Sequence, residues 1–78
     1  MEYEKLQIII AEILSVKPDY IKKEMSFVKD LGADSLEIFQ IIMGVEQEFD
    51  IVIQEDTLEK IDTVGDLLRI VSGDGKKF

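Results

Sequence analysis

Ser35 is the residue with the clearest potential for chemistry in this 78-residue chain. It follows Asp34, and Glu37 stands three residues after that aspartate. This spacing is typical of a helix start, where each acidic side chain accepts a hydrogen bond from the backbone N–H of the other residue. Gly32, just before, permits a turn that a bulkier residue would resist. Taken alone, such a pattern is commonly only a helix cap, but it predicts a serine hydroxyl at an exposed corner.

The residues that usually activate a nucleophilic serine are missing. The chain contains no histidine and no cysteine, which excludes the Ser-His and Cys-His pairs and the usual zinc ligand sets. It also lacks a phosphate-cradling glycine loop and the ligand spacing of a calcium loop. Paired carboxylates could act as acid and base, but the sequence indicates no concave apolar site that would shift their pKa values. We therefore expect no enzyme activity and no metal site.

Apolar residues at helical spacing predict the elements that position Ser35. We expect an all-α fold, a small antiparallel bundle of three main helices plus one short helix, with a long loop between the first and second helices. Pro18 limits the first helix, because the residue before a proline is disfavoured in helical geometry. The predicted elements are a helix over 2–15, a loop to residue 34, helices over 35–49 and 55–61 with an extended connector between them, and a last helix capped by Thr63 with Asp66 and stopped by Gly73.

Each of these predicted helices, and the long loop, contributes residues to the predicted core. We expect one domain over residues 1–78, with 1–72 folded and 73–78 forming a frayed tail. Residues predicted to face the core are Leu6, Ile9, Ile10, Ile13 and Leu14, then Ile21, Phe27, Val28 and Leu31 in the loop, Ile38, Ile41, Ile42, Val45 and Phe49, and finally Leu58, Ile61, Val64, Leu67, Leu68 and Val71. Without disulfides, a chain this short depends on such a core.

The acidic residues are concentrated in one part of the chain. The net charge is −8, and the stretch from Asp30 to Glu59 holds nine acidic residues and no basic one. Such a field repels nucleic acid and anionic membranes and attracts proteins with basic patches, although a charge run is commonly only a solvated face. No apolar run approaches the roughly 20 residues that span a bilayer, and no secretory signal pattern is present, so we expect a cytoplasmic protein.

The second predicted helix has more apolar surface than one buried face requires. Leu36, Phe39 and Met43 form a second stripe, separate from the core stripe and beginning beside Ser35. One interpretation is that this stripe packs under the long loop. The other is a partly exposed docking strip for partner proteins, with the adaptable Met43 suited to several of them. Its acidic rim would consist of Glu37, Glu46 and Glu48.

The string Leu-Gly-Ala-Asp-Ser-Leu-Glu over residues 31–37 closely resembles the attachment site of the acyl carrier proteins. The stretches 46–51 and 63–66 resemble the end of that family's second helix and the start of its last, so the resemblance covers roughly residues 2–72. It implies that Ser35 carries 4'-phosphopantetheine from coenzyme A, with Asp34 and Leu36 completing the motif. It further implies a phosphopantetheinyl transferase, an acyl chain held as a thioester, a monomer, and acyl-transferring and chain-elongating enzymes of fatty-acid biosynthesis that dock through basic surfaces.

Several positions depart from the commonest fatty-acid pattern of this family. Gln40 and Gln47 stand where acidic residues are usual, Phe39 where a smaller aliphatic is usual, Gly44 where alanine is usual and Gln54 where proline is usual. Most of them lie on the predicted docking helix. A dedicated carrier for another pathway, such as a polyketide or D-alanyl carrier, is therefore an alternative. An unmodified acidic adaptor that binds basic proteins is a further one.

Overall fold

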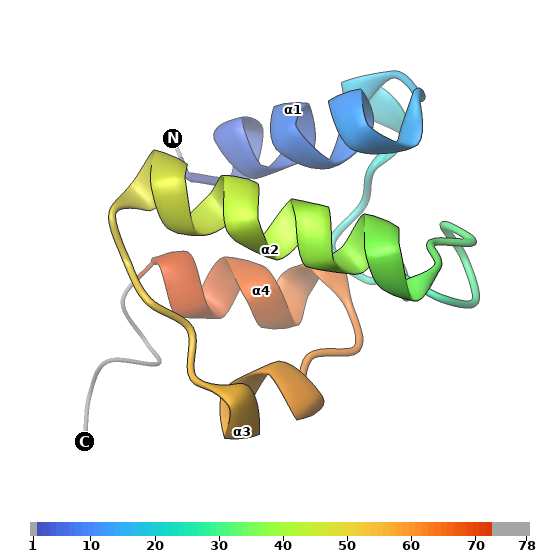
Figure 1. Ribbon diagram of the computed structural model, residues 1–78. Coiled ribbons are helices and arrows are strands. Elements are labelled where there is room, and N and C mark those ends of the chain that lie inside the picture. Colours follow the sequence, from blue (N-terminus) through green and yellow to red (C-terminus); the bar gives the residue numbers. More distant parts are fainter. Residues whose placement is uncertain (1, 73–78) are drawn as a thin grey trace.

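The computed structural model describes residues 2–72, which form four α-helices and one short 3-10 helix. These are α1 (Glu2–Leu14), η1 (Pro18–Tyr20), α2 (Ser35–Phe49), α3 (Glu55–Glu59) and α4 (Val64–Val71). Helices α1 and α2 run in opposite directions, and α4 lies next to them and runs in the same direction as α2, as Figure 1 shows. The short α3 lies at the edge of the bundle. The predicted all-α bundle is therefore confirmed.

The first helix ends by its own backbone geometry, before Pro18 is reached. Ser15 adopts a left-handed conformation with φ 60°. The N–H of Val16 then donates to the carbonyl of Ala11 at 3.0 Å, a bond that satisfies one of the last free carbonyls of the helix. The helix thus stops at Leu14, one residue earlier than predicted.

The long loop over residues 15–34 is held by specific hydrogen bonds. The carbonyl of Ile21 accepts from the Tyr3 hydroxyl at 2.9 Å and from Gln7 Nε2 at 2.8 Å, both on α1. Further along, Ser26 pairs with Thr63 in an isolated β-bridge. Neither η1 nor this bridge was predicted. The bridge joins residues far apart in the sequence, and η1 is a single turn held by the local bonds from Tyr20 to Lys17 and from Ile21 to Pro18. They fix the path of the chain toward α2.

The core contains most of the residues predicted for it. Those that are almost fully buried are Leu6, Ile10, Ala11, Ile21, Phe27, Ala33, Ile41, Ile42, Val45, Ile53, Val64, Leu67 and Val71. Ala11, Ala33 and Ile53 were not predicted, whereas the remaining predicted positions are half-buried at its margin except for Val28. The prediction for Val28 was wrong, since its side chain is exposed. Its neighbour Phe27 takes the inward position, because the N–H of Phe27 donates to the carbonyl of Asp62 and Val28 lies on the turn that follows.

The C-terminal part follows the predicted order of elements. Residues 51–54 form an irregular connector, and α3 ends at Glu59, two residues before the predicted end. Thr63 caps α4 together with Asp66 in the predicted reciprocal arrangement. The proposed stop at Gly73 and the predicted tail over 73–78 lie outside the described residues. Within residues 2–72, no helix has the length and apolar character needed to cross a membrane.

Candidate functional site

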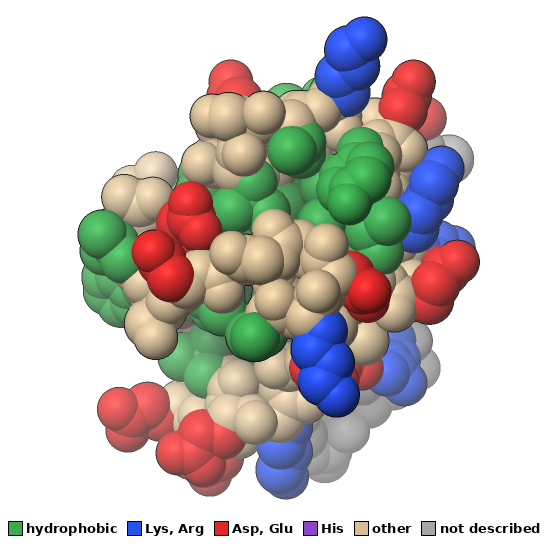
Figure 2. Space-filling view, turned by 90° about the vertical axis from the view of Figure 1, so that its right-hand side faces the viewer, with side chains coloured by type: hydrophobic (Ala, Val, Ile, Leu, Met, Phe, Trp, Pro, Cys, Tyr) green, Lys and Arg blue, Asp and Glu red, His purple; other side chains and the backbone are tan. Residues whose placement is uncertain are grey.

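Ser35 is the first residue of α2 and is exposed to solvent. The predicted cap is confirmed in both directions. Asp34 Oδ1 accepts from the Glu37 N–H at 2.8 Å, and Glu37 Oε1 accepts from the Asp34 N–H at 3.1 Å. This reciprocal pair fixes the direction in which the chain enters the helix. The serine hydroxyl is therefore presented at a rigid corner, and Figure 2 views the molecule from this end.

The start of α2 can accommodate a negatively charged group on Ser35. The first backbone N–H groups of a helix have no intrahelical acceptor, and the positive end of the helix dipole lies there. Asp34 occupies the N–H of Glu37, which leaves those of Ser35 and Leu36 at the first two positions of the helix. These donors suit the oxygens of a phosphodiester. The nearby carboxylate of Asp34 opposes such a group by repulsion.

A pocket of about 470 Å³ begins at Ser35 and extends between α2 and the α3 region. Its apolar lining comes from the loop, from α2 and from the segment around α3: Phe27, Val28, Ile38, Phe39, Ile41, Ile42, Met43, Ile53, Leu58 and Ile61. Its polar lining consists of Ser35, Glu46, Glu55 and Asp62. This volume lies within the range of small-molecule sites, roughly 300–1,000 Å³. The sequence did not indicate this concave apolar site. The lining residues are too scattered in the sequence to indicate it.

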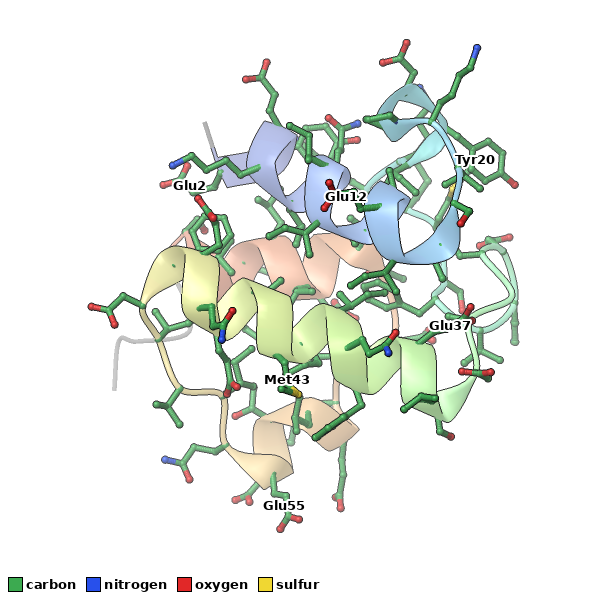
Figure 3. All side chains as sticks on the ribbon, turned by 45° about the horizontal axis from the view of Figure 1, so that its top comes forward. Glu2, Glu12, Tyr20, Glu37, Met43 and Glu55 are labelled. Atoms are coloured by element: carbon green, nitrogen blue, oxygen red, sulfur yellow. The ribbon has the colours of Figure 1, made fainter. Side chains whose placement is uncertain are left out.

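The second apolar stripe of α2 is exposed. Leu36, Phe39 and Met43 retain 63%, 59% and 46% of their accessible surface. The interpretation that this stripe packs under the long loop is thus wrong. Phe39 and Met43 also line the pocket, and Figure 3 shows Met43 projecting from α2 toward α3. The same two side chains therefore belong both to the outer surface and to the wall of the pocket.

Each of the three acids predicted to rim this stripe already has an intramolecular partner. Glu37 takes part in the cap described above. Glu46 Oε2 accepts from the backbone N–H of Ile53 at 2.8 Å. Glu48 Oε2 lies 3.8 Å from Lys5 Nζ on α1, in an exposed ion pair. The partner of Glu37 was predicted from the cap pattern. Those of Glu46 and Glu48 were not, because they depend on packing between elements. Their roles in docking remain predictions.

A carboxyl with a lowered pKa lies away from Ser35, at the start of α4. Asp66 Oδ2 accepts from the N–H groups of Asp62 and Thr63 at 2.9 and 3.1 Å, and these bonds hold the pKa of the Asp66 carboxyl below its usual value. Arg69 Nη2 lowers the pKa further through its contact with Oδ1 at 2.8 Å. This carboxylate stabilises the last helix and the turn that precedes it.

Comparisons with known proteins agree with this geometry. Residues 4–71 match the family described as "Phosphopantetheine attachment site". The chain belongs to the acyl carrier protein family. It is 45% identical over 74 residues to the acyl carrier protein of Bdellovibrio bacteriovorus, with 95% of each chain covered. It is also 45% identical over 71 residues to that of Clostridium acetobutylicum, covering 91% of this chain and 92% of the relative.

A solved structure supports the same relationship. A protein of Mycobacterium tuberculosis assigned as an acyl carrier protein superposes with a TM-score of 0.88 at 38% identity, covering 92% of this chain and 96% of that one. The cofactor of this carrier family is 4'-phosphopantetheine. The relatives are named as carriers, consistent with the absence of histidine and cysteine from this chain. Exposed Ser35, the helix start and the adjoining pocket are compatible with that cofactor.

Proposed function

We propose that this carrier holds acyl groups as thioesters on a 4'-phosphopantetheine arm attached to Ser35 and presents them to enzymes of fatty-acid biosynthesis. The observation that supports the proposal best is that Ser35 is exposed and also stands at the rim of a largely apolar pocket. An arm fixed there reaches outward to partner enzymes or inward to the pocket. The arm supplies the thiol that the chain itself lacks.

The other residues around Ser35 have separate roles in holding the arm and the acyl chain. The N–H groups of Ser35 and Leu36 stabilise the phosphodiester, while the pair Asp34 and Glu37 keeps the helix start rigid. The aliphatic and aromatic lining of the pocket takes the acyl chain out of water, which is favourable by about 0.8 kcal/mol for each buried methylene. An acyl chain stored in this way is shielded until a partner enzyme receives it.

Partner recognition combines the apolar stripe with the acidic charge of the region. Leu36, Phe39 and Met43 provide short-range contact, and the acids steer basic partner surfaces toward the arm. Because Glu37, Glu46 and Glu48 have internal partners, steering depends on their charge more than on new direct bonds. The proposed partners are a phosphopantetheinyl transferase and acyl-transferring and chain-elongating enzymes. We propose that the protein acts as a monomer in the cytoplasm.

The attachment at Ser35 is tested by the mass of the intact protein. The purified apo protein is incubated with coenzyme A, magnesium and a broad-specificity phosphopantetheinyl transferase. We expect a mass gain of one phosphopantetheine in the wild type and none in Ser35→Ala, whose circular dichroism should match the wild type because Ser35 caps nothing. No gain with several transferases would contradict the proposal and favour the acidic adaptor.

A dedicated carrier for another pathway is the second candidate function. It is favoured by Phe39, a large aromatic where the commonest fatty-acid pattern has a smaller aliphatic residue, and one that is exposed beside Ser35. Large aromatic residues at protein contacts often dominate binding. Turnover of the holo protein by a ketosynthase of ordinary fatty-acid synthesis separates the two candidates. Turnover equal to that of the enzyme's native carrier supports the first, and much slower turnover supports the second.

A further inference from the structure

Glu46 is built into the wall of the pocket. It lies on the same side of α2 as Phe39 and Met43, and all three line the pocket. Its Oε2 accepts from the backbone N–H of Ile53 at 2.8 Å, and Ile53 is only 7% exposed and lines the pocket as well. A charge-assisted bond of this kind is stronger than one between neutral groups. It connects α2 directly to the connector that leads into α3.

This bond is distinctive among those of the α3 region. Within residues 2–72, the other hydrogen bonds of residues 52–61 join positions inside that same stretch. The apolar anchors Ile53, Leu58 and Ile61 all border the pocket, so one side of each faces a hollow and not a filled core. Figure 1 shows α3 at the edge of the bundle, reached by the connector from the end of α2. The two ends of this wall are held by the bonds from the Ile51 N–H to the Glu46 carbonyl and from the Phe27 N–H to the Asp62 carbonyl. Between these ends, the wall is attached by the Glu46 bond and by apolar packing.

We propose that Glu46 is a latch on this wall, a positioning residue whose bond to the Ile53 N–H holds the connector and α3 against α2 and so keeps the pocket closed around its acyl chain. The inference rests on the proposed function. Without an acceptor at this position, the N–H of Ile53, a residue that is only 7% exposed, loses its hydrogen bond. An unsatisfied buried donor is unfavourable, so the connector moves toward water and the pocket opens. Glu46 thereby has a structural role in addition to the docking role proposed for Glu37, Glu46 and Glu48.

Two substitutions of Glu46 separate the length of the side chain from its charge. Glu46→Gln keeps both the length and an oxygen acceptor and removes the charge. Glu46→Asp keeps the charge but is one methylene too short for the bond. Glu48 provides the matched control, because it lies on the same helix, is exposed, pairs with Lys5 and does not line the pocket. Glu48→Asp shortens a carboxylate on α2 in the same way, away from this wall.

The first measurement follows amide hydrogen exchange of Ile53 in the apo proteins by NMR. We expect exchange to accelerate about tenfold in Glu46→Asp, the factor that corresponds to losing roughly 1.4 kcal/mol of a charge-assisted bond. Glu46→Gln and Glu48→Asp should remain within about threefold of the wild type, since a neutral acceptor retains much of the bond. The amide of Val45 in the buried part of α2 reports global opening and should not change. Equal exchange of Ile53 in all four proteins overturns the latch.

The second measurement uses the holo proteins loaded with octanoyl or acetyl groups and treated with hydroxylamine, which cleaves exposed thioesters. We expect Glu46→Asp to lose the octanoyl group several-fold faster than the wild type, with Glu46→Gln and Glu48→Asp unchanged. The acetyl group has little apolar surface to bury in the pocket, so its cleavage should be equal in all four. Acceleration of both groups, or acceleration in Glu46→Gln alone, overturns the latch. If Ser35 accepts no arm, the proposed function fails, while Ile53 exchange still decides whether the latch exists.

Discussion

Replacing Phe39 by alanine tests whether this residue belongs to the docking surface or to the core. The side chain is 59% exposed, so roughly two-fifths of its surface is covered. Complete burial of a phenylalanine side chain contributes about 1.5–3 kcal/mol, and scaling by the covered fraction predicts a loss of about 1 kcal/mol in the free energy of unfolding. The helix cap that presents Ser35 should be unaffected, because Phe39 contributes nothing to it.

Phe27 is the matched control for this experiment. It lines the same pocket but is only 3% exposed. Phe27→Ala removes the same atoms from a packed site and should cost about 3–5 kcal/mol, since a cavity remains. Urea denaturation followed by circular dichroism measures both values.

The second part of the prediction for Phe39 concerns its affinity for partner enzymes. If Phe39 is an anchor of the docking strip, Phe39→Ala weakens binding to a cognate partner enzyme by about 1–3 kcal/mol, or about ten- to a hundredfold in Kd. Calorimetric titration of holo wild type and variant with that enzyme measures the difference. Phe39→Val should behave similarly and improve turnover by enzymes whose usual carriers have a smaller residue there. A loss of several kcal/mol of stability in Phe39→Ala, equal to that of Phe27→Ala, would refute the reasoning and make Phe39 a core residue.

Two further predictions concern stability. Because the pKa of Asp66 is lowered in the folded state, its carboxylate stabilises the fold fully above the ordinary pKa of 3.8, and this contribution is lost as pH falls through the lower folded value. Denaturation from pH 7 to pH 2 should show wild type more stable than Asp66→Asn at pH 7 and the difference vanishing in acid, whereas a constant difference would contradict this assignment. Gly44→Ala gains about 1 kcal/mol of helix propensity, against a contact in which the new methyl lies 3.2 Å from Ile9 Cγ2. We expect a small net rise in melting temperature, and a fall would mean that α1 and α2 cannot separate by a few tenths of an ångström.

Local patterns in the sequence were sufficient for the helices and for the position of Ser35. The bounds of α2, the reciprocal cap of Asp34 with Glu37 and the second cap at Thr63 were all predicted, because each depends on residues within one or two turns. The burial of Ile41 and Val45 followed from helical spacing alone. The resemblance around Ser35 identified the family, which the comparisons confirmed.

Tertiary packing decided the remainder. The pocket joins residues of the loop, α2 and the α3 region, and no periodicity within one segment indicates a hollow between segments. Phe27 is buried and Val28 exposed because the loop follows contacts with α1 and Thr63 that lie far away in the sequence. The sequence alone does not distinguish Glu46 from Glu48, because both are glutamates on the same helix. A helical turn of 3.6 residues places two positions two residues apart on different sides, so packing directs Glu46 to the connector and Glu48 to α1.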